Sequence, residues 1–174
     1  MTTPTPAAWD RVAAGRAGGI SWIFARAIER AAELARAEAA APRPAGVPRR
    51  ALDVGCGSGR LVARLAAAGY CVVGVDADPA MARCATAGLA GGEGGGGSPA
   101  PGGLGGLVAD AGRLPFADGT FGLVTATSLL GCLDAPAPFL GEAYRCLAPG
   151  GALIVTATNR ASRLLRLNYH LPRR

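Results

Sequence analysis

The chain has 174 residues and a mass of 17.3 kDa, 50% of its residues are hydrophobic, and its formal net charge is +6. This composition excludes a generic disordered chain, and the length suits one domain around a single core. No apolar run reaches the roughly 18 residues of a transmembrane helix, and the sequence does not start like a secretory signal. We therefore expect a cytoplasmic protein.

The cysteines and the charge distribution restrict the class of protein further. Five cysteines without Cys-x-x-Cys spacing, together with one histidine, predict reduced thiols and neither a disulfide framework nor a metal site. All 18 basic residues are arginines, and five of them fall in residues 159–174, which contain no acid. The rest of the chain is nearly neutral, which disfavours nucleic acid as a partner.

Hydrophobic periodicity predicts one helix followed by a strand–helix alternation. Apolar residues at helical spacing predict an amphipathic helix over residues 20–40, and the prolines of 41–48 predict a linker. Strands are predicted at 51–54, 71–75, 107–109, 121–127 and 152–158. Helices are predicted between them at 60–68, 79–87 and 138–147. The alternation indicates an α/β fold with an open, doubly wound, mostly parallel sheet of about five strands.

Residues 88–106 interrupt the alternation, and 11 of these 19 residues are glycine. Glycine loses much conformational entropy when it is ordered, so we expect a flexible insertion between a helix and a strand. A mobile lid over a ligand is the alternative. The absence of an aromatic residue from the segment disfavours it.

The turn after the first predicted strand carries the clearest chemical signal. Asp53-Val54-Gly55-Cys56-Gly57-Ser58-Gly59 places a Gly-x-Gly-x-Gly turn directly before a helix. Glycines permit a tight turn and the close approach of a ligand to the main chain, and a helix N-terminus attracts a negative group. The turn alone suits a dinucleotide as well as other adenosine ligands.

Acidic residues stand near the ends of three successive predicted strands. Asp76 follows the second strand, where a carboxylate accepts hydrogen bonds from both hydroxyls of a ribose. Asp110 follows the third strand, within reach of the exocyclic amine of a base, and Asp53 precedes the glycines, near a cationic amine. Each acid alone is explained by a turn or a cap. Together they predict a nucleoside-type ligand at the carboxyl edge of the sheet.

Several motifs, in their order along the chain, resemble those of class I S-adenosylmethionine-dependent methyltransferases of the small-molecule type. The resemblance covers roughly residues 50–160. The motifs are Leu52 to Gly59, Val75-Asp76 with Met81, Ala109-Asp110-Ala111, Leu114-Pro115-Phe116 with Asp118 and Phe121, and Leu147-Ala148-Pro149-Gly150-Gly151. The resemblance implies a Rossmann-like fold, S-adenosylmethionine as cofactor, and methyl transfer to a small molecule by in-line displacement.

The resemblance also implies a role for each matching residue. The methionine part of the cofactor would lie against Asp53, Gly55, Cys56, Gly57 and Gly59. The ribose and adenine would lie against Asp76, Ala77, Met81, Asp110 and Ala111, while Thr127 and Ser128 would face the methyl group and the acceptor. Any catalytic base is a weaker expectation: His170 and Ser128 are candidates, ahead of Tyr144, Tyr169 and Asp134, which we interpret as packing, tail or turn residues.

We therefore divide the chain into three parts: a helical cap with its linker (1–49), a cofactor-binding α/β unit (50–158) and a basic tail (159–174). Trp9, Trp22 and Phe24 gather in the cap, so we expect it to shape an acceptor pocket, or else to staple its helix to the body. The leucines of the tail predict a helix packed on the sheet, with attachment to an anionic membrane as the alternative.

The sequence departs from the family pattern at three points. Gly122 stands where the family usually has Asp, and the Asn/Asp-Pro-Pro-aromatic motif of enzymes that methylate adenine or glutamine is absent. The last two strands of the usual seven are also missing, so we expect a fragment, a truncated gene product, or a shortened variant that completes its sheet in another way. The fifth strand would then have a free edge that invites self-association.

Two other functions remain open at this point. One is a truncated, non-catalytic module that binds S-adenosylmethionine or S-adenosylhomocysteine. The other is a NAD-dependent oxidoreductase, which fits the glycines and Asp76 but not Asp53, Asp110 or Pro149-Gly150-Gly151.

Overall fold

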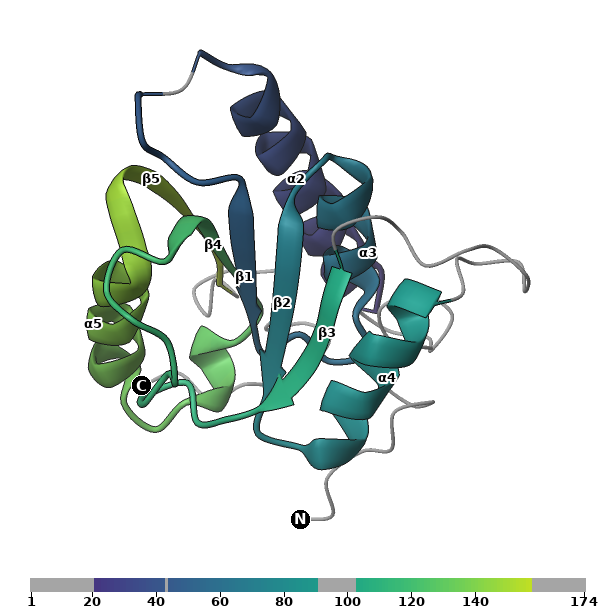
Figure 1. The fold of residues 1–174 in the computed structure, drawn as a ribbon. Coiled ribbons are helices and arrows are strands. Elements are labelled where there is room, and N and C mark those ends of the chain that lie inside the picture. The colour runs from purple at the N-terminus through teal and green to yellow at the C-terminus, as the bar shows by residue number, and fades with distance from the viewer. Residues whose placement is uncertain (1–20, 43, 91–102, 158–174) are drawn as a thin grey trace, which may run out of the picture.

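A five-stranded, fully parallel sheet forms the centre of the molecule (Figure 1). The computed structural model describes residues 21–42, 44–90 and 103–157. The strands are β1 (Arg50–Val54), β2 (Cys71–Asp76), β3 (Gly103–Val108), β4 (Phe121–Thr127) and β5 (Leu147–Thr156), in the order β3-β2-β1-β4-β5. The predicted fold class is confirmed. The order reverses between β1 and β4, which makes their carboxyl ends the topological switch point.

Helices cover both faces of the sheet (Figure 1). One face carries α2 (Ser21–Ala40), α3 (Arg60–Ala67) and α4 (Pro79–Ala90), and the other carries α5 (Pro136–Cys146), which follows the short 3-10 helix η1 (Leu130–Cys132). Two apolar cores result, one on each face. The expected N-terminal helix is confirmed as α2.

Small residues set how closely α2 packs. Ala31, Ala32 and Ala35 are buried, and they share a core with Leu65 and Leu123. Alanine has high helix propensity and a short side chain, so it lets the helix approach its neighbours closely. The same core reaches Ala152 and Ile154 of β5, so α2 is part of one hydrophobic core with the sheet.

The prediction of a glycine-rich insertion over 88–106 is wrong at both ends. Helix α4 continues through Ala90, and β3 begins at Gly103 and ends at Val108. Gly106 pairs with Gly74 of β2, and a Cβ on Gly106 would lie 2.0 Å from the carbonyl oxygen of Ala82 in α4. Glycine is required there because the helix lies directly on the strand. Residues 91–102 lie outside the described residues, so the lid alternative is not tested.

Strand β5 also begins earlier than predicted. Helix α5 starts at Pro136 and ends at Cys146, and the Pro149-Gly150-Gly151 motif lies within β5 instead of closing the helix. The ladder between β4 and β5 changes register between its first two pairs, and Gly150 has a φ of 79°. Proline and glycine are found in strands at edges and irregularities of this kind.

The departure at Gly122 has a structural cause. A Cβ at this position would lie 2.1 Å from the carbonyl oxygen of Pro48, so the linker before β1 leaves no room for a side chain. None of the helices in the described part of the chain combines the length and apolarity that crossing a bilayer requires. The tail, Trp9 and the side chain of Trp22 lie outside the described residues, and the three-part division of the chain stays a prediction.

Candidate functional site

The glycine turn is fixed at the switch point by the neighbouring strand and helix. The N–H groups of Gly55 and Cys56 both donate to the carbonyl oxygen of Val75, at 2.8 and 3.0 Å. A Cβ on Gly59, whose φ is 82°, would lie 2.6 Å from Cα of Ala85, so α4 packs directly against the turn. Gly57 has a φ of 52°, and a Cβ there would meet nothing within 4 Å. The turn is therefore packed on one side and open at Gly57.

Asp76 lies at the end of β2 and bonds to the glycine turn. Its Oδ2 accepts a 2.9 Å hydrogen bond from the N–H of Gly57, and its Oδ1 accepts one of 3.0 Å from the N–H of Asp78. A carboxylate has about four acceptor positions on its two oxygens, so both keep capacity for ligand hydroxyls. The half-buried side chain is thus oriented by the backbone before any ligand binds.

Asp53 lies near the end of β1, two residues before Gly55, with a relative exposure of 1%. The hydroxyl of Thr125 on β4 donates a 2.7 Å hydrogen bond to its Oδ1. Burial raises the pKa of Asp53 to about 7, the Thr125 bond opposes this rise, and the negative charge of Asp76 adds to it. A carboxyl group with this pKa changes its charge easily when a cation approaches.

Cys56 contributes its backbone N–H to the turn, while its side chain points into the core. Its Sγ would lie 2.9 Å from a Cβ on Gly74, which explains the glycine in β2. Burial raises the pKa of the Cys56 thiol, and the charges of Asp53 and Asp76 raise it further. The thiol therefore stays protonated and acts as a small packing group.

Asp110 and its neighbours form the third part of the site. Oδ1 of Asp110 accepts a 2.8 Å hydrogen bond from the N–H of Gly112, while its Oδ2 has no partner among the described residues. The side chain is exposed and Ala111 is half-buried. One oxygen thus holds the turn after β3 and the other is free for an amine.

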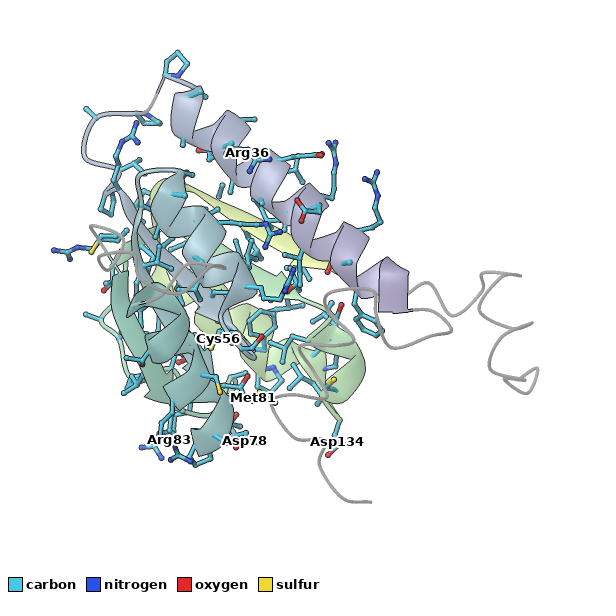
Figure 2. The ribbon with its side chains drawn as sticks, turned by 90° about the vertical axis from the view of Figure 1, so that its right-hand side faces the viewer. Arg36, Cys56, Asp78, Met81, Arg83 and Asp134 are labelled. Atoms are coloured by element: carbon cyan, nitrogen blue, oxygen red, sulfur yellow. The ribbon has the colours of Figure 1, made fainter. Side chains whose placement is uncertain are left out.

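Met81 and Ala77 complete the ligand edge. Met81 is 3% exposed on α4, whereas Ala77 is exposed just before that helix. In Figure 2, Cys56 and Met81 lie in the lower half of the molecule, with Asp78 beyond Met81 at the end where the strands finish, and Arg36 lies far from them on α2. Asp78 caps α4, because its Oδ1 accepts from the N–H of Ala80 at 2.8 Å.

The segment after β4 faces the glycine turn. Thr127 ends the strand and Ser128 follows it with a φ of 61°. The side chain of Leu129 lies against Gly55: its Cδ1 would be 3.0 Å from a Cβ there. The sequence did not predict Leu129 or Thr125 as site residues. The only signals were that Leu129 follows Ser128 and that Thr125 lies on the strand that pairs with Asp53.

Arg145 on α5 is a second feature that the sequence analysis missed. Its guanidinium pairs with both carboxylate oxygens of Glu142 at 2.8 Å and also binds Asp118 and the carbonyl oxygens of Leu114 and Phe116. Glu142 in turn accepts a 2.7 Å hydrogen bond from the N–H of Leu114. This arrangement fixes the loop that follows Asp110. Its signal in the sequence is the pair of opposite charges three residues apart on one helix.

The remaining candidates for a base do not join this group. Tyr144 is 82% exposed on α5, so the expectation that it packs is wrong, and Asp134 is exposed in the loop before α5 (Figure 2). His170 and Tyr169 lie outside the described residues. Within residues 21–42, 44–90 and 103–157 no group of three His, Cys, Asp or Glu side chains could hold a metal ion.

A parallel α/β sheet with a glycine turn and carboxylates at its switch point defines a domain that binds an adenosine-type cofactor. The comparisons identify which one. A methyltransferase domain family model matches residues 52–155, and the chain belongs to this family. S-adenosylmethionine is therefore its cofactor. The residues present fit it, since Gly57 is open and Asp76 and Asp110 keep free acceptor positions at the same edge.

The chain is similar to a curated enzyme and to several solved structures. The ubiquinone/menaquinone biosynthesis C-methyltransferase UbiE of Desulfotalea psychrophila is 47% identical over 51 residues, which are 29% of this chain and 21% of that protein. The [4+2]-cyclase SpnF is 27% identical with a TM-score of 0.58, over 77% of this chain and 47% of that one. A SAM-dependent methyltransferase of Methanosarcina mazei is 28% identical with a TM-score of 0.51, over 61% and 50%. The chain spans half or less of the length of these relatives.

Proposed function

We propose that the chain transfers the methyl group of S-adenosylmethionine to a small-molecule acceptor by in-line displacement. The observation that carries the proposal is the open glycine turn beside Asp76 and Asp110, at the switch point of a methyltransferase-family sheet. The family membership favours S-adenosylmethionine over a dinucleotide, so the oxidoreductase alternative is set aside. A cytoplasmic location belongs to the same proposal.

Different polar groups at this edge of the sheet bind different parts of the cofactor. Asp76 accepts from the two ribose hydroxyls, and Oδ2 of Asp110 accepts from the adenine amine, with the Ala111 backbone and Ala77 beside the ring. Met81 supports this end from α4. Asp76 ends β2, Met81 lies on α4, and Asp110 follows β3, the strand that pairs with β2, so neighbouring elements position the groups that would hold the ribose and base.

Asp53 acts on the amino-acid half through its charge. The side chain is only 1% exposed and accepts the Thr125 hydrogen bond. A ligand ammonium over the glycine turn would therefore act on Asp53 by its charge, with the Thr125 bond kept. The positive charge of the ammonium would lower the pKa of Asp53 from about 7 and favour its ionised form. Binding of the ammonium and ionisation of Asp53 therefore support each other.

The chemistry requires positioning more than an activated protein nucleophile. When bound, the cofactor would supply a methyl group on a sulfonium, and the neutral thioether that leaves is a good leaving group. The chain holds the acceptor atom in line with the breaking bond, about 3–3.5 Å from the carbon, which contributes several kcal/mol. Thr127 ends β4 and Ser128 follows it, and on the acceptor side of the glycine turn the Ser128 hydroxyl would orient an acceptor group. A role for His170 as a base stays a prediction.

Calorimetric titration tests the cofactor, and a methylation assay tests the reaction. We expect micromolar binding of S-adenosylhomocysteine, no saturable binding of NAD, and transfer of label from S-adenosylmethionine to one member of a small-metabolite set. Tight binding of NAD, or failure to bind S-adenosylhomocysteine, would contradict the proposal.

A second candidate function is a binding module that does not transfer methyl groups. One observation favours it: SpnF, which is 27% identical over 77% of this chain, is a cyclase. This module would bind S-adenosylhomocysteine as tightly but give no labelled product with any acceptor.

We also propose that a second copy of the chain pairs with β5. This strand is at the edge of the sheet formed by the described residues, and Leu153 on it is 39% exposed. A free apolar strand edge favours pairing with another strand. Light scattering across a concentration series tests this, since a monomer at the highest concentration would contradict it.

A further inference from the structure

The backbone is strained at one point of the ligand edge. Among the non-glycine residues that the structure describes, Ser128 alone has a positive φ, of 61°. L-amino acids rarely adopt this left-handed conformation, and strain of this kind persists only where surrounding contacts impose it. Ser128 directly follows β4, next to the switch point.

Thr156, the last residue of β5, supplies the contacts. The N–H of Ser128 donates to Oγ1 of Thr156 at 3.0 Å and to its carbonyl oxygen at 3.2 Å. Thr156 is the register partner of Thr127, so its hydroxyl lies beside the turn where the chain leaves β4. A side chain without an oxygen at position 156 would leave the turn with the carbonyl bond alone.

The turn determines where Leu129 lies. Its side chain contacts Gly55, with Cδ1, Cβ and Cγ at 3.0, 3.5 and 3.6 Å from a Cβ position on the glycine. The N–H of Cys132 donates to the Leu129 carbonyl oxygen at 2.8 Å, which continues the chain into η1. Leu129 thus forms a wall over the first glycine of the turn, and a change of backbone conformation at Ser128 would move it.

We propose that Thr156 is a positioning residue for the cofactor: its hydroxyl fixes Ser128 in the left-handed conformation and so holds Leu129 over Gly55, beside the amino-acid half of S-adenosylmethionine. This rests on the proposed function, in which the glycine turn binds that half. Thr156 contacts no ligand itself and acts through the turn.

A double-mutant cycle tests the proposal, with S-adenosylhomocysteine as the probe. Thr156→Val keeps the shape but removes the hydroxyl, and Leu129→Ala removes the wall. Each should weaken binding about 3- to 10-fold, the size expected for one lost hydrogen bond. Because the hydroxyl acts through the leucine, the double variant should bind no more weakly than the weaker single variant. Thr156→Ser, which keeps the hydroxyl, should bind like the parent.

Three results would overturn the inference: losses that add up in the double variant, an unchanged affinity of Thr156→Val, or no rescue by Thr156→Ser. If Thr156→Val does not fold, Ser128→Val, which places a β-branched side chain in the same strained turn, takes its place in the cycle. A competition with 5′-methylthioadenosine, which lacks the amino-acid half, should show no loss in Thr156→Val. A parent protein that fails to bind S-adenosylhomocysteine contradicts the proposed function instead.

Discussion

The hydroxyl of Thr125 donates a 2.7 Å hydrogen bond to Oδ1 of Asp53 where β1 and β4 pair, and both side chains are almost completely buried. The bond favours the ionised carboxylate, but burial outweighs it and raises the pKa of Asp53 to about 7. A carboxyl group of this kind couples the stability of the protein to pH.

The free energy of unfolding should fall as the pH rises from about 4 to about 7, by on the order of 2–4 kcal/mol from Asp53. The sign follows from the raised pKa: in this window the folded state keeps a proton that the unfolded chain has lost. Urea denaturation across the window measures the slope. Asp53→Asn, which cannot ionise, should have a flatter profile, and equal slopes in the two proteins would contradict the prediction.

Replacing Asp76 by Ala should weaken the binding of S-adenosylhomocysteine by about 1.5–3 kcal/mol, because a charged acceptor is lost. The same change frees the N–H groups of Gly57 and Asp78. Asp76→Asn serves as the control, since its amide oxygen still accepts from one of these groups, and calorimetry should give it an intermediate affinity. Parent-like binding by Asp76→Ala would place the ribose elsewhere.

Arg145→Lys should loosen the loop over residues 114–118. A lysine cannot make the paired bonds to Glu142 or reach both carbonyl oxygens, so the melting temperature should fall. Hydrogen exchange at the Leu114 amide, which bonds to Glu142, should also become faster. Arg83→Lys, an exposed change on α4, is the matched control and should alter neither quantity.

Gly106→Ala should destabilise the protein by about 1–3 kcal/mol, the usual cost of overpacking. The added Cβ would lie 2.0 Å from the Ala82 carbonyl oxygen, so α4 and β3 must move apart. Gly141→Ala is the opposite case: nothing lies within 4 Å of its Cβ position in α5, and alanine there should add about 0.5–1 kcal/mol. Thermal unfolding of the two variants should shift in opposite directions.

Periodicity predicted the sheet and its helices, because strands buried on both faces and helices buried on one leave plain patterns. It did not predict the edges of the glycine-rich segment. Glycine signals flexibility and close packing equally well, and Gly106 is there for packing against α4. The start of β5 was missed for the same reason, since proline and glycine usually end an element and here lie within an irregular strand.

Asp53, Asp76 and Asp110 lie at or next to the carboxyl ends of parallel strands, which periodicity predicts, while their roles toward a ligand stay predictions. The contacts that fix Asp53, the turn after β4 and the loop after Asp110 could not be predicted. Thr125 bonds to Asp53 on a neighbouring strand, Thr156 bonds to Ser128 in the turn after β4, and Arg145 on α5 bonds to a loop that precedes β4. Such contacts depend on register and helix orientation, which a single sequence does not specify.

The first and last described elements share one core: the alanines of α2 pack with Ala152 and Ile154 of β5. A ribosome releases α2 early and β5 only after almost the whole sheet has been made. Leu65 of α3, which is made soon after α2, can cover part of the apolar face of α2 early, but the contacts with Ala152 and Ile154 form only after β5 is made, so closure of this core is a late, long-range step.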